Sequence, residues 1–332
     1  MNLKIVATFF LITALLSCST EKRPREVVLF DTYCASCHMV PDIQDLPKDI
    51  WEQNVLPDMA ARMGIITTEN HPYHHLTFPE QIAIIKTGVY PNKPSIDEKD
   101  WELLKNYILD MAPDSIRRNI EDVNSSTVSQ FTAKPIALDS SKGSLFTFLK
   151  IDALNNQILT GNRSGRLMAL DLNTYESTHL GNFNLAITNA KVTGDSIYVT
   201  NMGVMNPNEI PRGTTVLRYG NATAILQDSL HRPVHTLYTD LNNNGNEEII
   251  ISEYGDLKGT LTLLEKDAYG FYKNKTLLSV PGSLRVIAKD MNKDDKNDLV
   301  VLAAQGDEAI YILYQNENLE FTVEKVVRFS PV

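Results

Sequence analysis

The segment YCASCHMV, residues 33–40, holds two cysteines, Cys34 and Cys37, that are separated by two residues and followed directly by His38. The chain has 332 residues, and its only other cysteine is Cys18. Two thiols and an imidazole at this spacing suit three chemistries: half of a zinc site, a redox dithiol, or covalent attachment of a c-type haem. Because each chemistry needs a different compartment and a different surrounding fold, the rest of the sequence discriminates among them.

The first residues have the pattern of an export signal. Lys4 supplies a positive charge, and an apolar run over residues 5–16 follows it. This run is too short for a transmembrane helix, which needs about 20 residues. The sequence LLSC that ends it resembles the lipobox of bacterial lipoproteins. The resemblance implies a signal peptide over residues 1–17, cleavage before Cys18, acylation of that cysteine, and a lipidated tether over residues 18–26. A plain secretory signal with an incidental cysteine is the alternative.

If Cys18 carries lipid, Cys34 and Cys37 are the only cysteines left for other chemistry, outside the cytoplasm. A structural zinc site needs four ligands, and the sequence has no second CxxC pair. A thioredoxin-like dithiol needs a βαβ context, whereas the pattern around these residues is helical. The remaining chemistry is a c-type haem, with thioethers to both cysteine sulfurs and His38 as the proximal ligand of the iron.

Helical patterns lie on both sides of the motif. Val27, Phe30, Cys34 and Cys37 share one apolar face, and the ring of Phe30 is expected beside the haem edge. A second helix is predicted within SIDEKDWELLKNYILDMAP, residues 95–113, which begins with Ser95 as a candidate cap and ends at a proline. The residues expected to face inward from it are Trp101, Leu104, Ile108 and Met111, or the neighbouring Leu103 and Tyr107.

An N-terminal CxxCH helix that crosses an aromatic C-terminal helix resembles the class I cytochrome c domain, here over residues 27–117. In that family a methionine between the two helices binds the iron on its far side. We predict Met59 as this distal ligand, because Pro57 is expected to break the preceding turn as family loops do. Met63 is interpreted as an apolar residue that fills space in the core. The rival distal ligands, otherwise surface residues of an irregular loop, are His71, His74 and His75.

The second half of the sequence has a different periodicity. A polar segment rich in Ser and Thr, residues 118–142, is predicted to be a linker or a first wrapping strand. After it, short apolar runs are separated by Gly, Asn and Asp, which predicts an all-β domain over residues 143–332. The fold class is therefore multidomain, an all-α domain followed by an all-β domain.

Two segments of the β half, YTDLNNNGNEEIIISEYGD and AKDMNKDDKNDLVVLAAQGD, repeat at a distance of fifty residues. Side-chain oxygens at loop positions 1, 3, 5 and 9, with a backbone carbonyl at position 7, are typical of calcium loops. The two predicted ligand sets are Asp240, Asn242, Asn244, Asn246 and Glu248, and Asp290, Asn292, Asp294, Lys296 and Asp298, with Asn246 and Lys296 acting through their carbonyls. The alternative is an Asx-rich turn without a metal ion.

Because a strand and not a helix follows each loop, the repeat resembles the FG-GAP (VCBS-type) repeat. The resemblance implies a β-propeller with a calcium loop inside each blade. Gly245 occupies the sharp turn of the first loop, and Asp295 takes its place in the second, where a left-handed backbone is less well tolerated. Four units of blade size can be traced, which is the low end for closed propellers. We expect a truncated propeller, part of a longer protein, with a small closed ring as the alternative.

The formal net charge of −10 argues against a nucleic-acid partner. We predict a mono-haem electron-transfer protein that is lipid-anchored in the cell envelope, facing the periplasm or in the outer membrane. It would exchange electrons with a redox partner protein, while the propeller docks a protein or a carbohydrate.

Two other functions remain open. The propeller could be a sugar or alcohol dehydrogenase that passes electrons to its own haem, or an adhesion module regulated by the cytochrome. The residues available for a propeller active site, each expected to be an ordinary surface or satisfied side chain, are His179, His231, Arg232 and His235.

Overall fold

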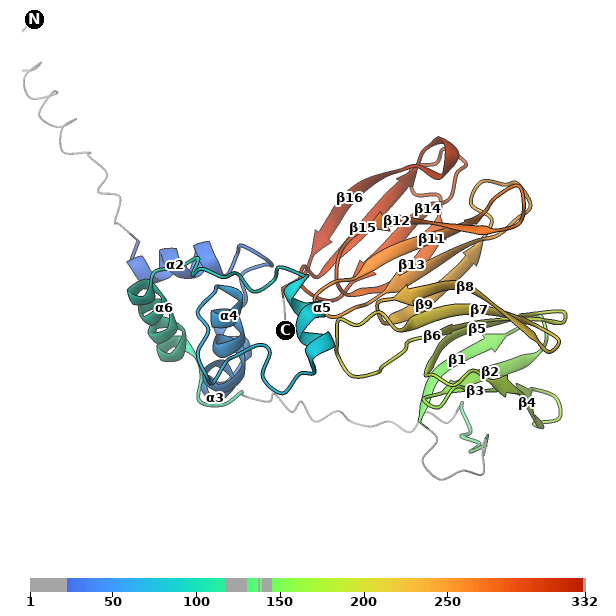
Figure 1. The fold of residues 1–332 in the computed structure, drawn as a ribbon, viewed down its shortest axis with the longest axis horizontal. Helices are drawn as coiled ribbons and strands as arrows, with labels where there is room; N and C mark the ends of the chain where they lie inside the picture. The colour runs from blue at the N-terminus through green and yellow to red at the C-terminus, as the bar shows by residue number, and fades with distance from the viewer. Residues whose placement is uncertain (1–22, 117–129, 137, 139–144, 331–332) are drawn as a thin grey trace, which may run out of the picture.

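The computed structural model describes residues 23–116, 130–136, 138 and 145–330. A small helical part is followed by a larger all-β part (Figure 1). The predicted signal peptide, Cys18 with its lipid and most of the predicted linker lie outside the described residues, and residues 131–136 form no strand. Within the described ranges, no helix combines the length and the apolar character that crossing a membrane requires.

The helical part consists of short elements. Their bounds are α2 (Arg25–Tyr33), a 3-10 turn (Ile43–Asp45), α3 (Lys48–Ile50), a π-helical turn (Trp51–Val55), α4 (Leu56–Arg62), α5 (Phe78–Ile85) and α6 (Glu98–Met111). The prediction that Pro57 breaks the turn before Met59 is wrong. Pro57 lies where the chain changes from π-helical to α-helical bonding, so its missing N–H removes a hydrogen bond there without ending the helical run.

The helix α6 begins later than its sequence suggested. Its N-cap is Asp97, whose side chain accepts a hydrogen bond from the N–H of Lys99 at 2.9 Å, and not Ser95. Asp and Ser cap helices about equally well, so the sequence could not rank the two. Ser95 instead donates its backbone N–H to the carbonyl of Met63 at 2.8 Å, which ties the end of α4 to the segment before α6.

The two outer helices of this part, α2 and α6, pack against each other. Phe30 meets Tyr107 edge to face, with ring centroids 6.0 Å apart, and Arg25 forms a forked ion pair with Asp100 at 2.7 Å. The predicted inward residues Trp101, Leu104 and Ile108 are buried. Met111 is not: it lies in the last turn of α6 and is 49% exposed.

Sixteen strands in the described part of the chain form four antiparallel sheets, and within each sheet every strand pairs with the next one in sequence. Their bounds are, in blade 1, β1 (Phe146–Asp152), β2 (Gln157–Asn162), β3 (Arg166–Asp171) and β4 (Ser177–Asn182); in blade 2, β5 (Ile187–Thr193), β6 (Ser196–Asn201), β7 (Gly213–Tyr219) and β8 (Ala222–Leu230); in blade 3, β9 (Pro233–Thr239), β10 (Glu248–Glu253), β11 (Thr260–Lys266) and β12 (Tyr272–Leu278); and in blade 4, β13 (Ser283–Lys289), β14 (Asp298–Ala303), β15 (Ala309–Gln315) and β16 (Phe321–Arg328).

The four sheets stack face to face in chain order, as propeller blades do (Figure 1). The first strands β1, β5, β9 and β13 lie innermost, next to one another. The strand β10 shows how consecutive blades are held, because all six of its residues are buried. Ile249 and Ile251 pack toward blade 2, whereas Ile250 packs toward blade 4. The predicted propeller-like all-β part with four blades is therefore confirmed.

The packing between blades predicts a large effect of truncating one core side chain. Leu263 on β11 is 1% exposed and lies in the core between blades 3 and 4. Leu263→Ala should lower the free energy of unfolding by about 3 kcal/mol through lost burial and a cavity. Leu154→Ala, at a residue that is 98% exposed, is the matched control and should change it little. Chemical denaturation measures both, and equal effects would contradict the described packing.

Candidate functional site

The CxxCH motif lies directly after the helix α2. Cys34 caps the helix and is 8% exposed within the helical core, whereas Cys37 lies in the following turn and is exposed. The two cysteines do not form a disulfide. The expectation that Cys37 shares the apolar face of the helix is wrong, because α2 ends at Tyr33 and the next turn carries Cys37 out of the core.

The side chain of His38 is held in one tautomer. Its Nδ1 lies 2.6 Å from the carbonyl oxygen of Met39, and a carbonyl oxygen only accepts hydrogen bonds. Nδ1 must therefore carry the proton of the neutral ring, so the lone pair is on Nε2. Histidines that bind a metal ion are usually oriented in this way, with the outer N–H donated to a backbone carbonyl or a carboxylate.

The environment of Cys34 does not suit a redox dithiol, one of the alternatives to haem attachment for a CxxC pair. Burial, helped by the charge of Asp31, raises the pKa of the Cys34 thiol to about 12, whereas reactive dithiols have a lowered pKa. Nor does any group of three or more His, Cys, Asp or Glu side chains come together at metal-binding distance among the residues that the structure describes.

The residues predicted as candidates for the distal ligand of a haem iron fall into two groups. Met59 on α4 packs against the apolar cluster that includes Cys34, and Met63 at the end of α4 belongs to the same cluster. The three histidines of the rival set line a separate surface hollow of about 400 Å³; they are His71, His74 and His75. The structure thus brings the methionines and Cys34 into one core and leaves the histidines outside it.

The two predicted calcium loops connect the first and second strands of blades 3 and 4, and they fold alike. In each loop the Asp at position 1 accepts hydrogen bonds from the backbone N–H groups of positions 5 and 6. These donors are Asn244 and Gly245 for Asp240, and Asp294 and Asp295 for Asp290. Position 6 is left-handed in both, with φ of 84° at Gly245 and 66° at Asp295. The second loop therefore adopts the turn in spite of its aspartate.

The carboxylates at position 9 of the two loops are buried and hydrogen-bonded to backbone. Glu248 is 1% exposed and accepts the N–H of Leu241, and its burial raises its pKa. Asp298 is 0% exposed and accepts the N–H groups of Met291 and Gln315 at 2.8 Å each. Each carboxylate thus stabilises the base of its own loop. Calcium binding by the loops stays a prediction.

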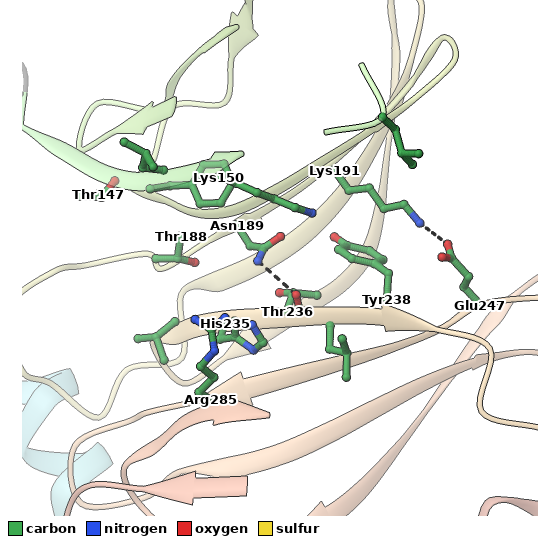
Figure 2. Close-up of a pocket in the computed structure, with 15 residues that line it drawn as sticks. Thr147, Lys150, Thr188, Asn189, Lys191, His235, Thr236, Tyr238, Glu247 and Arg285 are labelled. Atoms are coloured by element: carbon green, nitrogen blue, oxygen red, sulfur yellow. Dashed lines mark hydrogen bonds and ion pairs between the residues drawn. The ribbon is translucent and has the colours of Figure 1, made fainter. Parts of the chain in front are cut away.

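A cavity of about 610 Å³ lies among the inner strands of all four blades (Figure 2). Each inner strand contributes a basic or imidazole side chain to it: Lys150 from β1, Lys191 from β5, His235 from β9 and Arg285 from β13. Lys191 forms an ion pair with Glu247. Sequence reasoning named only His235 of these residues, and treated it as an ordinary histidine.

A signal for this cavity was present in the sequence. His235 and Arg285 are fifty residues apart, the same distance that separates the two predicted calcium loops. Lys150 and Lys191 are each the fifth residue of the first strand of their blades. His235 and Arg285 are each the third residue of theirs, so aligning the strands, and not only the loops, would have grouped these side chains in two matching pairs.

The environment of His235 keeps its ring neutral. Burial, together with the positive charges of Arg285 and Lys150, lowers its pKa from 6.5 to about 4. Its Nδ1 lies 3.5 Å from the backbone N–H of Val286, which donates to it. The proton of the neutral ring is therefore on Nε2, so this histidine is a donor with no charge of its own.

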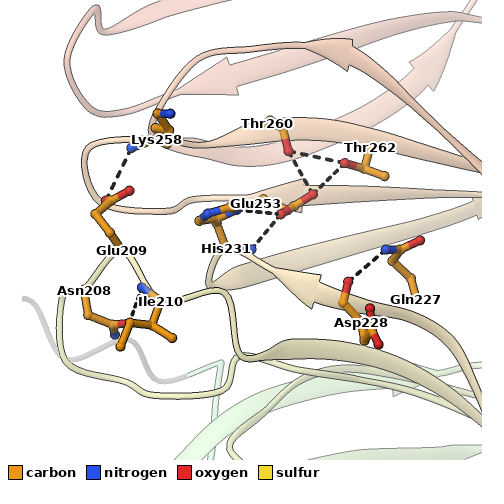
Figure 3. A network of polar contacts seen from close by, with 10 residues as sticks. All are labelled: Asn208, Glu209, Ile210, Gln227, Asp228, His231, Glu253, Lys258, Thr260 and Thr262. Carbon is orange, nitrogen blue, oxygen red and sulfur yellow. Dashed lines mark hydrogen bonds and ion pairs between the residues drawn. The ribbon is translucent and has the colours of Figure 1, made fainter. Parts of the chain in front are cut away.

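The other propeller candidates take part in structural hydrogen bonds, and Figure 3 shows the network around His231. The backbone N–H of His231 donates to Glu253, which is 4% exposed and also accepts from Thr260 and Thr262. Arg232 donates to the carbonyls of Gly255 and Met205. His179 is bonded to Asn182. These side chains do not line the central cavity, and the buried Nε of Arg232 has no hydrogen-bond partner among the described residues.

Comparison with known proteins does not identify a family. No family model matches the chain, and no curated protein matches it. The solved structures that align with just over half of it include the following three. The computationally designed Ika4 protein does so at 16% identity and TM-score 0.35, over 55% of this chain and 99% of its own. The WD40 domain of SCAP from fission yeast aligns over 56% of this chain at 8% identity and TM-score 0.36. A putative gluconolactonase aligns over 55% of it at 9% identity and TM-score 0.36.

The present chain spans only 46% of the SCAP domain and 63% of the putative gluconolactonase. Similarities at this level carry no argument about function. The propeller-like arrangement follows from the strand pairing itself.

The lowered pKa of His235 predicts a dependence of stability on pH. The unfolded chain takes up a proton near pH 6.5, and the folded one only near pH 4. The stability should therefore be complete above pH 6.5 and fall as the pH drops toward 4, by about 3 kcal/mol for this group. His235→Gln should flatten that slope in melting curves recorded from pH 7 to pH 4. His179→Gln, at an exposed histidine, is the control; an unchanged slope in His235→Gln would contradict the assignment.

Proposed function

We propose that this chain is a membrane-anchored electron-transfer protein that works outside the cytoplasm. In this proposal the helical part is a class I cytochrome c domain with one covalent haem, and the propeller docks a redox partner protein or a carbohydrate. The observation that carries it is the pairing of a CxxCH turn with a histidine whose Nε2 lone pair is free to bind a metal. The crossing of α2 and α6 through Phe30 and Tyr107 supports the same family resemblance.

The residues of the helical part fit a c-type haem. Cys34 and Cys37 would form the thioethers, His38 would bind the iron through Nε2, and Met59 would bind it from the other side. Bound haem supplies reversible one-electron chemistry. If His38 and Met59 both hold the iron, the domain would pass electrons without binding a substrate there. The donated Nδ1–H of His38 fixes the ring and raises the basicity of the ligating nitrogen.

The helical part is in contact with the propeller on the side of α5. The Lys258 side chain, in the loop between β10 and β11, donates to the carbonyl oxygen of Lys86 at the end of α5, at 3.3 Å. A docked partner on this side of the propeller would lie close to the helical part. In the proposal, the lipid on Cys18 keeps both parts at the membrane surface.

The haem assignment is tested by expression in a host with c-type haem maturation. The wild-type protein should keep a peroxidase stain on a denaturing gel, and Cys34→Ala/Cys37→Ala should lose it, because no thioether can form. Met59→Ala should keep the stain but lose the weak sulfur–iron absorption band at the red end of the visible spectrum. Met63→Ala, the matched control on the same helix, should keep both. Absence of stain in the wild-type protein would contradict the proposal.

We also propose that the loops Asp240–Glu248 and Asp290–Asp298 bind calcium, on the strength of their shared turn geometry. Binding to the folded state alone would stabilise the propeller by about 2.7 kcal/mol for each occupied loop at a calcium concentration of 100 times Kd. The melting temperature should therefore rise in calcium and fall in chelator. Asp240→Ala should lose part of this gain.

A matched control for the calcium loops is Asp267→Ala. Asp267 accepts the backbone N–H groups of Tyr269 and Phe271 in a turn of blade 3 that belongs to neither predicted ligand set. Its replacement should lower the melting temperature but leave the calcium-dependent gain unchanged. Identical melting of the wild-type protein in calcium and in chelator would show that the loops are metal-free Asx turns.

A further inference from the structure

We propose that the central cavity of the propeller binds a small hydroxylated carboxylic acid, of the chemical class of sugar acids. The cavity, about 610 Å³, is of the size that small-molecule sites have in proteins. It opens among the inner strands of all four blades, so its lining comes from segments that are far apart in the sequence (Figure 2). This binding site is independent of the haem and goes beyond the electron transfer proposed above.

The cavity carries positive charge that the protein does not neutralise. Lys191 is paired with Glu247. Lys150 and Arg285, by contrast, have no ion-pair partner in the part of the chain that the structure describes, although both line the cavity. They approach from blades 1 and 4, and both act on His235 between them. Two unpaired cations around one hollow attract an anion, and a guanidinium group matches the two oxygens of a carboxylate.

The neutral ring of His235 adds a donor to this site. Its Nδ1 accepts from Val286, so Nε2 carries the proton. Because the ring is uncharged, it can donate to a carboxylate or a hydroxyl oxygen without adding to the repulsion between Lys150 and Arg285. An anion at this position would be surrounded by donors from three blades.

A second, independent observation indicates that the ligand also carries hydroxyl groups. Asn189 is only 7% exposed and lines the same cavity. Its Nδ2 donates to the carbonyl oxygen of Thr236 at 3.1 Å, but its Oδ1 has no hydrogen-bond partner among the described residues. A buried acceptor without a donor is unfavourable, and the cations of the cavity do not reach it. A ligand O–H group would satisfy it.

These two requirements select the ligand class. Chloride, sulfate or acetate supplies the negative charge but no donor for Asn189. A neutral sugar supplies the hydroxyl groups but no charge for Lys150 and Arg285. A hydroxylated carboxylic acid supplies both.

The test is calorimetric titration of the purified full-length protein with D-glucuronate, D-glucose and acetate. Glucuronate is glucose with its C6 hydroxymethyl group oxidised to a carboxylate, so it keeps the ring hydroxyl groups, gains the charge and should bind about tenfold more tightly than either of the other two. Arg285→Gln should weaken glucuronate binding about tenfold. Lys289→Gln removes a cation from the same strand outside the cavity, and it should leave binding unchanged.

Several results would overturn the inference. Equal affinity for glucose and glucuronate would show that the cations do not select an anion. Unchanged binding in Arg285→Gln would place the ligand elsewhere, and tighter binding of glucose 6-phosphate would assign a phosphate ester in place of a carboxylate. The titration is repeated with Cys34→Ala/Cys37→Ala, which cannot hold haem covalently. Failure of the haem proposal and failure of this one therefore remain distinguishable.

Discussion

The burial of both faces of each inner sheet is the constraint on which the rest of this molecule depends. A four-stranded sheet with two apolar faces is not stable alone in water, and here consecutive blades cover each other. The strand β10 is buried throughout, with alternate isoleucines turned toward blades 2 and 4. This stacking brings the first strand of every blade to a common centre, and the cavity and its ring of cations exist only because of it.

Polar residues are placed where the stacking leaves room for them. The position-9 carboxylates Glu248 and Asp298 are buried at the base of their loops, where backbone N–H groups satisfy them. Glu253 is satisfied in the same way by hydroxyl and backbone donors. In the cavity, by contrast, the Oδ1 of Asn189 has no hydrogen-bond partner, and Lys150 and Arg285 have no ion-pair partner, among the described residues. The contrast distinguishes a candidate binding site from a braced loop.

The helical part is stabilised differently, because it is small and Cys34 of the CxxCH motif is itself part of its core. Cys34 lies in the same apolar cluster as Trp51, Met63 and Trp101. The edge-to-face contact of Phe30 and Tyr107 and the fork between Arg25 and Asp100 fix how α2 crosses α6. The way α2 crosses α6 thus determines where a group attached to Cys34 and Cys37 would lie relative to the core.

The sequence by itself determined what depends on local pattern. The period of apolar residues separated a helical part from four strand-rich units, and the CxxCH spacing limited the chemistry of residues 34–38. The left-handed position of the loops was also visible, at Gly245. The exact start of α6 could not be determined in this way, because Asp97 and Ser95 are almost equally good N-cap residues.

Only the tertiary structure decided what depends on residues far apart in the chain. Lys150, Asn189, His235 and Arg285 come from four different blades, and each looks ordinary in its own strand. Their meeting is a product of sheet stacking, which no local pattern encodes. The shifted pKa of His235 has the same origin, since burial and two distant cations cause it. The tautomer of His38 likewise depends on where one backbone carbonyl lies, and this is a property of the folded turn.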